Sequence, residues 1–418
     1  MDFVTNNASS NSFRRSRWFQ IGRAVNTDPL ADRALADARP AVFWLDRPDR
    51  PHPSPALSSD LDADLVVVGG GFTGLWTALC AVEGDPGRSV VVLEAEATAV
   101  GASGRNGGFC DASLTHGLEN GLAHWPDEVR TLVRLGDENL VGLLDTVERH
   151  AIDCTPEHTG ELNVAVTPWQ VEGLTESAAA HRDHGMEATL LDAAQTRAQV
   201  DSPTYLAGLW RRDGVVLVDP ARLAWGLRSA AEGLGVRFFD RSPVRSLRTE
   251  TDGDHPAVRI RTDGGSVVAD RAVVATNAFR SPVRQISRSV VPVYDHVLVT
   301  EPLSEAQRAS VGWSGRQGLS DVGNQFHYYR LTPDDRILWG GWDALYHFGN
   351  RVGPALEQSP ATSRTLARHF FETFPQLRGL RFTHRWGGPI ATTSRFTCAW
   401  GTSHGGRVAW AAGYTGLG

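Results

Sequence analysis

The earliest clear pattern along the chain is a pair of short apolar runs with a helical pattern between them. Residues 65–68 and 90–93 are continuous apolar runs, which are typical of buried strands. A glycine-rich turn follows the first run, residues 75–82 have helical apolar spacing, and GDPG supplies a turn before the second run. The order of strand, tight turn, helix and strand predicts a βαβ unit.

Two further helices are predicted downstream. Apolar positions recur at helical spacing between residues 126 and 150, and Pro126 suits a first turn. In DPARLAWGLRSAAEGLG we expect Asp219 as the N-cap, Pro220 as the first helical residue, and Gly233 or Gly235 as the stop. The strand-like runs VRFF, VRSLRT, AVRIRT, SVVA and RAVVATNA come next, with DGG as a hairpin turn.

The pattern changes near residue 290. VVPVYDHVLVT and QFHYYRLTPDDRILWGGW alternate between apolar and polar residues as antiparallel strands do, with PDD as a turn. A helix is expected around residues 363–374, before HRWGGPIATTSRF and the closing GRVAWAAGYTGLG. The antiparallel material therefore interrupts the elements that surround the βαβ unit.

Composition narrows the possible functions. A chain of 418 residues is long enough for two packed domains, and a net charge of −7 without a clustered basic face argues against nucleic acid as a partner. Cys80, Cys110, Cys154 and Cys398 lie far apart with no CxxC pair, so we expect no metal site, no disulfide framework and a reducing, cytoplasmic setting.

Every basic side chain is arginine, because the sequence contains no lysine. This excludes lysine Schiff-base chemistry, pyridoxal-phosphate attachment and a Walker A loop within the chain. No apolar run reaches the roughly 18 residues of a membrane helix, so no membrane span is expected. RRSRWF resembles an export signal but lacks the apolar region that should follow it, so export is not expected.

The turn after the first strand carries a nucleotide-binding motif. Gly69, Gly71 and Gly74 form G-x-G-x-x-G between the strand and the helix. The first glycine permits the turn, the second lets the backbone approach a pyrophosphate, and the third lets helix and strand pack closely. Glu94 ends the second strand, where a carboxylate can bind a ribose. These features together predict a bound dinucleotide.

The segment after Glu94 indicates which dinucleotide is bound. A nicotinamide dehydrogenase would continue with further parallel βα units, whereas residues 99–109 here form a glycine-rich loop that lets a bulky group approach the backbone. This favours a large flat cofactor, namely a flavin.

At this point the chain resembles the D-amino-acid oxidase-like (DAO) FAD-dependent oxidoreductases, which include glycine oxidase and sarcosine oxidase. The resemblance rests on VVVGGGFTGLWTA, VVLEAE, GASGRNGG, VDPARLAWGL, VVATNA, WGGPI and GYTGLG. FWLD, the GASGRNGG loop, and YYRLTPDDRILWGG with RWGGPI make the γ-glutamylputrescine oxidase-like branch the most similar.

The pattern and the resemblance together predict an α/β (α+β) fold of two domains. A Rossmann-like FAD-binding domain is expected from residues 61–111, 206–289 and 385–418, with an inserted antiparallel-sheet substrate domain from 112–205 and 290–384. Residues 1–60, with Arg14, Arg15 and Arg17, are expected to form a partly disordered N-terminal arm. Because family members continue into a helix after GYTGLG, we expect the chain to be C-terminally truncated.

The resemblance also implies the residues that hold FAD, which we expect to be bound non-covalently. Gly69, Gly71, Thr73, Gly74 and Glu94 would bind the ADP half. Ser103, Arg105, Asn106, Gly107 and Gly108 would lie along the pyrophosphate and isoalloxazine, and Val244, Thr276 and Asn277 would flank the adenosine. The loop 413–418, with Gly413, Tyr414, Thr415 and Gly416, would lie beside the pyrimidine end of the ring and open a helix whose N-terminus stabilises negative charge.

The implied reaction is oxidation of an amine or amino-acid C–N bond, in which hydride passes to flavin N5 and the imine hydrolyses to an aldehyde or keto acid with release of ammonia. Candidate substrate-pocket residues are His327, Tyr328, Arg330 and Trp386. Alternation puts His327 and Tyr329 on one strand face and Tyr328 and Arg330 on the other. Arg330 would bind a substrate carboxylate or face solvent, Tyr328 would cage the amine or pack, and Trp386 would lie near the ring or in the core.

Two alternatives to an oxidase stay open. Sarcosine-type oxidases use a lysine near the flavin in the reaction with oxygen, and this chain has none. Either another cation does that work and oxygen is the electron acceptor, or the acceptor is an electron carrier. A dehydrogenase for D-amino or N-methyl amino acids is one alternative, and an inactive fragment that does not retain flavin is the other. His116 and His327 are possible proton shuttles, of which His116 is the weaker candidate.

Overall fold

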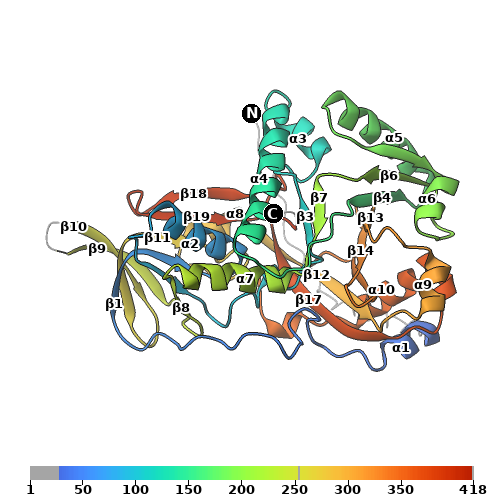
Figure 1. Cartoon of the computed structure of the whole chain (residues 1–418). Coiled ribbons are helices and arrows are strands. Elements are labelled where there is room, and N and C mark those ends of the chain that lie inside the picture. Colours follow the sequence, from blue (N-terminus) through green and yellow to red (C-terminus); the bar gives the residue numbers. More distant parts are fainter. Residues whose placement is uncertain (1–27, 253–254, 417–418) are drawn as a thin grey trace, which may run out of the picture.

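Two β-sheets that lie side by side form the body of the protein (Figure 1). A computed structural model describes residues 28–252 and 255–416. Within them, no helix is long and apolar enough to cross a membrane. The sheet on the left of Figure 1 carries the glycine-rich turn, and the sheet on the right carries most of the aromatic core.

The first sheet contains the predicted βαβ unit. β1 pairs in parallel with β2 on one side and with β11 on the other, and β2 and β11 in turn pair in parallel with β8 and β19. The strand order is β18 (Ala399–Ser403), β19 (Val408–Ala412), β11 (Ser266–Val274), β1 (Leu61–Val68), β2 (Val90–Leu93) and β8 (Arg237–Phe239), with β10 (His255–Arg261) and β9 (Ser246–Asp252) attached to β11. Val68 lies opposite both Leu93 and Val274, so the carboxyl ends of these strands meet at one edge.

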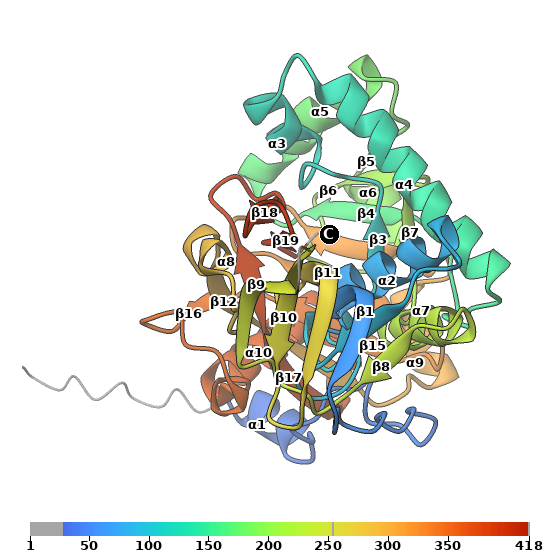
Figure 2. The same ribbon diagram turned by 90° about the vertical axis from the view of Figure 1, so that its left-hand side faces the viewer.

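Helices α2 (Phe72–Gly84) and α7 (Pro220–Gly233) pack on each other against this sheet. Asp219 caps α7 by accepting hydrogen bonds from the amides of Ala221 and Arg222, as predicted. The helix ends at Gly233, and Gly235 has a positive φ of 96°. The helical pattern at 126–150 corresponds to α4 (Val129–Arg149), which is preceded by a separate short helix, α3 (Leu118–His124). Figure 2 shows both at the top of the molecule, with α5 (Pro168–Asp183).

In the part of the chain that the structure describes, the second sheet has nine strands. Their order is β16 (Leu345–Tyr346), β12 (Val291–Thr300), β15 (Ile337–Gly341), β14 (His327–Leu331), β13 (Gly318–Asp321), β4 (Glu161–Ala165), β6 (Ala207–Arg211) and β5 (Thr189–Asp192), with β17 (Phe382–Thr392) on the other side of β12. Its pairs are antiparallel except β13 with β4, which is parallel. PDD forms the predicted turn between β14 and β15.

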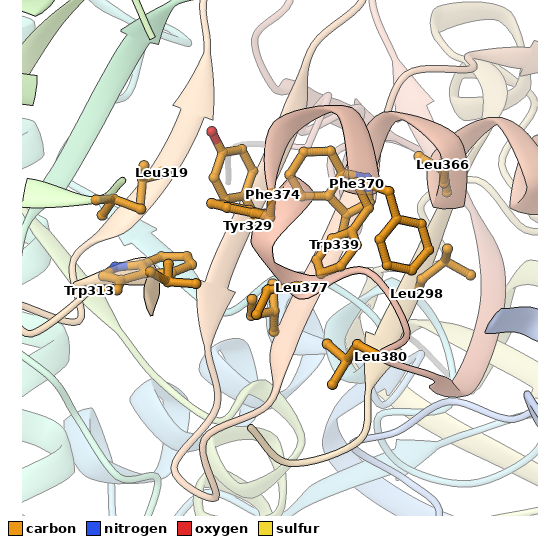
Figure 3. Close-up of a cluster of buried hydrophobic side chains, with 14 of the residues drawn as sticks. Leu298, Trp313, Leu319, Tyr329, Trp339, Leu366, Phe370, Phe374, Leu377 and Leu380 are labelled. Atoms are coloured by element: carbon orange, nitrogen blue, oxygen red, sulfur yellow. The ribbon is translucent and has the colours of Figure 1, made fainter. Parts of the chain in front are cut away.

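One face of the second sheet carries the largest aromatic cluster. Tyr329 and Trp339 project from neighbouring strands onto Phe370 of α10 (Pro360–Thr373) and onto Phe374, the C-cap residue of that helix, as Figure 3 shows. α9 (Glu305–Val311) and α1 (Pro29–Leu35) lie at the same end of the molecule, and α1 packs on α10. The opposite face of the second sheet is therefore the one that lies toward the first sheet and the glycine-rich loop.

Strand pairing departs from two of the expected domain boundaries. Residues 207–211 form β6, which pairs with β4 and β5, and residues 385–392 lie in β17, which pairs with β12. Both segments therefore belong to the second sheet rather than to the first. An apolar run has the same local pattern in either sheet, because its partner strand is distant in sequence. The rest of the predicted domain division stays a prediction.

The predicted N-terminal arm is integrated into the fold where it is described. Asp28 caps α1, and Trp44 and Leu57 are buried. The hydrogen bond from Trp44 Nε1 to Asn106 O, 2.9 Å long, ties this segment to the glycine-rich loop. Residues 28–60 are thus a packed strap rather than a free arm, because their few large apolar side chains reach the core. Arg14, Arg15 and Arg17 lie outside the described residues.

Candidate active site

The glycine-rich turn is as tight as its motif predicts. Gly69 has a φ of 113°, and a Cβ there would lie 2.6 Å from Ala275 O. A Cβ on Gly74 would lie 1.9 Å from Gly69 O, which is closer than any real contact. The turn and the start of α2 therefore pack backbone to backbone, leaving the helix N-terminus open to an anionic group.

Glu94 and Ser103 line this turn. The Glu94 carboxylate accepts hydrogen bonds from the amides of Gly70 at 2.6 Å and Glu96 at 3.0 Å, while burial raises its pKa. Ser103 Oγ accepts from the Phe72 amide at 2.8 Å. Thr73 Oγ1 donates to the hydroxyl of Tyr414 at 2.8 Å, which connects α2 to the C-terminal loop. Residues predicted from separate parts of the chain thus meet around one turn.

The loop that contains 99–109 includes a short 3₁₀ turn (Ala102–Gly104) and is held in place by its own side chains. The Asn106 amide nitrogen donates to Ala102 O and Ser103 O, and its oxygen accepts from the Gly108 amide. A Cβ on Gly107 would lie 2.9 Å from the ring of Tyr328, and one on Gly108 would lie 2.1 Å from Val218 O. These glycines allow the loop to lie directly against the second sheet.

Arg105 and Trp386 join the loop to β17. The Trp386 indole donates to Arg105 O at 3.0 Å, and Arg105 donates to Gly387 O at 2.9 Å. The Arg105 guanidinium also forms an ion pair with Glu357 at 2.6 Å. Trp386 is buried among core side chains, so its role is to fix the loop. Arg105 is neutralised by a carboxylate of this chain.

The remaining predicted cofactor residues lie where the first sheet and the C-terminal loop meet. Asn277 accepts a hydrogen bond from the Gly413 amide at 3.0 Å, and Thr415 Oγ1 donates to Gly413 O at 3.1 Å. Thr276 follows β11, and its hydroxyl is buried with no hydrogen-bond partner among the described residues. Val244 packs on the core of the first sheet, Gly416 is exposed with a φ of 93°, and Leu417 and Gly418 lie outside the described residues.

These features fit FAD. Three features surround one edge of a parallel sheet: a turn that no Cβ can enter, the half-buried Glu94 carboxylate that accepts a hydrogen bond from the Gly70 amide, and the Thr276 hydroxyl, which has no partner among the described residues. This is the edge at which doubly wound sheets bind dinucleotides. The fit concerns the ADP end most directly, since that is where the glycines and Glu94 lie.

The four predicted substrate-pocket residues do not lie together. Tyr328 faces the glycine-rich loop and donates to Asp295 at 2.5 Å. Arg330 lies on the same face of β14 but is fully buried, donating to Val218 O at 2.7 Å and Gly108 O at 3.3 Å and pairing with Glu157 at 3.1 Å. It is therefore neither solvent-facing nor free for a substrate carboxylate.

His327 projects from the opposite face, as the alternation predicted. Its ring stacks between Trp339 and Trp342 and contacts Asp321 and His369 at 3.0 and 3.1 Å. It thus packs on Trp339, a member of the aromatic core, rather than facing the loop side. His116 has a φ of 57°, and burial lowers its pKa.

The acidic residues of this region were not predicted from the sequence. Asp295 lies in the alternating strand β12 and contacts Tyr328, and Glu357 pairs with Arg105. Arg211 bridges Asp111 and Glu161 at 2.7 and 2.6 Å. Asp295 is an acid within a largely apolar strand, and this was the one available signal. The other partners come from distant segments and have no local signature.

The fold and the site place this chain among the flavin-dependent enzymes, and comparison with known proteins gives the family. The model of the DAO family, described as FAD dependent oxidoreductase, matches residues 64–418. The chain belongs to this family and is an FAD-dependent oxidoreductase.

Several relatives extend the comparison. The chain is 32% identical over 345 residues to the gamma-glutamylputrescine oxidoreductase of Escherichia coli (strain K12), covering 82% of this chain and 76% of that protein. It is 28% identical over 392 residues to the probable oxidoreductase OrdL of Haemophilus influenzae, covering 90% and 84%.

Solved structures share the fold. The L-proline dehydrogenase from P. horikoshii has a TM-score of 0.68 at 19% identity, covering 87% of this chain and 90% of that chain. The glycine oxidase from Geobacillus kaustophilus has a TM-score of 0.67 at 18% identity, covering 85% and 90%. The predicted two-sheet α/β architecture is confirmed at this level.

Proposed function

We propose that the protein oxidises the C–N bond of an amine that has no carboxylate on the reacting carbon, releasing an aldehyde and ammonia. γ-Glutamylputrescine is the model substrate. The similarity to gamma-glutamylputrescine oxidoreductase supports this choice, since that relative is 32% identical to this chain and its name states a substrate. Bound FAD would accept the hydride that leaves the carbon.

One observation carries the choice of an amine over an α-amino acid. The two arginines beside the glycine-rich loop are both engaged by this chain: Arg105 with Glu357 and Arg330 with Glu157. An α-amino acid requires a cation for its carboxylate, and breaking a partly buried ion pair to supply one is costly. The face of the second sheet that lies against the glycine-rich loop instead presents the carboxyl of Asp295, and a carboxylate there favours a cationic ligand.

The protein residues would position FAD and the amine rather than react covalently. Glu94, Ser103 and the glycine turn would hold the ADP half, and Trp44 and Trp386 fix the loop that would lie along the ring. Burial raises the pKa of the Cys110 thiol to about 12 and also raises that of Cys398. Both therefore stay protonated and are poor nucleophiles, so we propose that FAD is non-covalent. The four unpaired cysteines suit a reducing, cytoplasmic location.

The substrate proposal is tested by product analysis with FAD-loaded protein. γ-Glutamylputrescine, putrescine, glycine, sarcosine and D-alanine are compared by ammonia and aldehyde or keto-acid formation. We expect kcat/KM for γ-glutamylputrescine to exceed that for each α-amino acid by about tenfold or more, since a buried ion pair would otherwise have to open. A preference for sarcosine, glycine or D-alanine would contradict the proposal.

The electron acceptor is a separate question. The sequence has no lysine to place beside the flavin, which favours an electron carrier over oxygen. With a good amine substrate, we expect turnover with an artificial dye acceptor to exceed peroxide formation in air. Peroxide formation at the same rate as dye reduction would make the protein an oxidase.

A further inference from the structure

A carboxyl group without a cationic partner faces the glycine-rich loop. Asp295 in β12 lies opposite Gly388 in β17, so both point to the same face of the sheet. A Cβ on Gly388 would lie 3.2 Å from Arg105 Cδ, which identifies this face as the loop side. Within residues 28–252 and 255–416, no arginine or histidine forms an ion pair with Asp295.

The carboxyl is nevertheless held firmly. One oxygen accepts from the Tyr328 hydroxyl at 2.5 Å, and the other accepts from the His296 amide at 2.8 Å. The Tyr328 ring lies over Gly340, where a Cβ would come within 2.6 Å of the hydroxyl, and against Gly107. Each carboxylate oxygen has two acceptor positions, so capacity remains for a further donor.

This part of the face keeps some solvent exposure. Asp295 and Tyr328 are half-buried, whereas Val297 and Leu338 of the same face are buried. The surrounding groups still desolvate the carboxyl and raise the pKa of Asp295 to about 6. Near neutral pH the structure therefore holds a carboxylate in a crowded place without a counter-ion. Such a group is stabilised by a cation that enters from solvent.

The other charges around Asp295 do not supply that cation. On the loop side, Arg105 pairs with Glu357 and Arg330 pairs with Glu157. On the far side of the sheet, His327 contacts Asp321. Burial lowers the pKa of His296 to about 4, so this neighbour is neutral. The charged groups around Asp295 on the loop side of the sheet therefore leave one negative charge, that of the Asp295 carboxylate, without a compensating cation.

We propose that Asp295, held by Tyr328, binds the ammonium group of the amine substrate and accepts the proton that must leave it before the C–N bond is oxidised. This inference rests on the proposed function. In the step, an N–H bond of the R–CH2–NH3⁺ group breaks, the proton goes to the Asp295 carboxylate, and the neutral amine keeps the electron pair. The product is R–CH2–NH2 beside a neutral Asp295 carboxyl, and no electrons leave either group.

The test uses tert-butylammonium, which carries the charge but has no hydrogen on the carbon next to nitrogen and so cannot be oxidised. Its binding to FAD-loaded wild type and Asp295→Asn is measured by calorimetry and by the change in the flavin spectrum. We expect the variant to bind it about tenfold or more weakly. tert-Butanol, a neutral molecule of the same shape, should bind both proteins equally.

The pH dependence separates a charge effect from a change in shape. Wild-type affinity for tert-butylammonium should fall as the pH drops below about 6, where Asp295 becomes protonated. The Asp295→Asn variant should show no such fall. Tyr328→Phe removes a hydrogen bond that lowers the pKa of Asp295, so it should move the midpoint to higher pH.

Asp321→Asn is the matched control, because Asp321 is an acid of the same sheet whose partner, His327, points away from the loop. It should bind tert-butylammonium like wild type even where it lowers thermal stability. Equal affinity of wild type and Asp295→Asn, with the same pH dependence, would overturn the inference. Asp295-dependent binding without oxidation of any amine would leave the inference standing and contradict the proposed function. Oxidation of an amine together with tert-butylammonium binding that does not depend on Asp295 would support the proposed function and overturn the inference.

Discussion

At the scale of single residues, two side chains on the loop side of β14 have different partners. Tyr328 donates to Asp295, whereas Arg330 donates to Gly108 O and Val218 O and pairs with Glu157. Tyr328 and Arg330 were predicted for one strand face, and both lie there. The pattern did not reveal that Arg330 is saturated by Gly108 O, Val218 O and Glu157, because all three are distant in sequence. Asp295 was missed for the same reason, since only its contact with Tyr328 distinguishes it from other strand acids.

Arg330 should therefore support structure rather than substrate binding. Arg330→Lys loses the fork that reaches two carbonyls and Glu157, and we expect it to lower the free energy of unfolding by about 2–4 kcal/mol. Thermal or urea unfolding measures this. Arg308→Lys, at an exposed pair with Asp335, should change it by less than about 1 kcal/mol. An unaltered stability with a raised KM for carboxylate-bearing substrates alone would show that Arg330 binds substrate.

Glu94 should be required for cofactor retention. Glu94→Gln replaces the carboxylate that accepts a hydrogen bond from the Gly70 amide. A hydrogen bond to a charged group contributes about 1.5–3 kcal/mol to stability. We expect FAD affinity to fall roughly 10- to 100-fold, measured by titration of the apoprotein. Asp62→Asn, at an exposed position of the same first sheet, should leave FAD affinity unchanged. Equal FAD affinity of Glu94→Gln and wild type would remove this role.

At the scale of elements, turns and helix caps were predicted correctly from local signals, whereas the pairing of some strands was not. The glycine turn, the Asp219 cap and the PDD hairpin each depend on a few adjacent residues, and each forms as predicted. β6 and β17 were assigned to the wrong sheet, because a strand's own pattern does not specify which strand it pairs with.

Helix α2 offers a direct test of the tight packing that the motif requires. A Cβ on Gly74 would lie 1.9 Å from Gly69 O, whereas a Cβ on Gly84, at the end of the same helix, meets nothing within 4 Å. Gly74→Ala should lower the unfolding free energy by about 2 kcal/mol or more and weaken FAD binding. Gly84→Ala should be neutral or slightly stabilising, by up to about 1 kcal/mol. Similar effects of the two variants on unfolding and on FAD binding would contradict this account of the motif.

At the scale of the whole molecule, the packed strap and the glycine-rich loop hold the two sheets together. Trp44 and Trp386 donate to adjacent residues of the loop, Asn106 and Arg105. The family and the two-sheet architecture could be predicted from the chain because their motifs are local and ordered. The acidic character of the loop-facing surface could not, because it depends on pairs such as Arg105 with Glu357 that form only in the folded state.

Buried histidines should make the folded molecule sensitive to acid. Burial lowers the pKa of His296 and of His369 to about 4, from an ordinary value of 6.5. The unfolded chain therefore binds more protons between these values, so stability is lost as the pH falls below about 6.5. Asp295, with a pKa of about 6, opposes this between about pH 6 and 3.8, and Glu94, whose pKa is also raised by burial, acts in the same direction. His116 and His384, whose pKa values burial lowers, add to the loss of stability in acid.

We expect the melting temperature to be lower at pH 5 than at pH 7 by several degrees, and the fall to be smaller in His369→Gln. Differential scanning calorimetry at the two pH values measures both. An equal or higher melting temperature at pH 5 would mean that these histidines are protonated in the folded protein.

The roles proposed for Glu94 and Asp295 both depend on the chain binding FAD and using it to oxidise an amine. The most direct test is the visible absorption spectrum of the purified protein with FAD, followed without oxygen as γ-glutamylputrescine is added. We expect a flavin spectrum that bleaches on addition of the amine, at a rate about tenfold or more above the rate with glycine or sarcosine at the same concentration. A flavin that remains oxidised with γ-glutamylputrescine but bleaches with an α-amino acid, or a protein that binds no flavin, would contradict it.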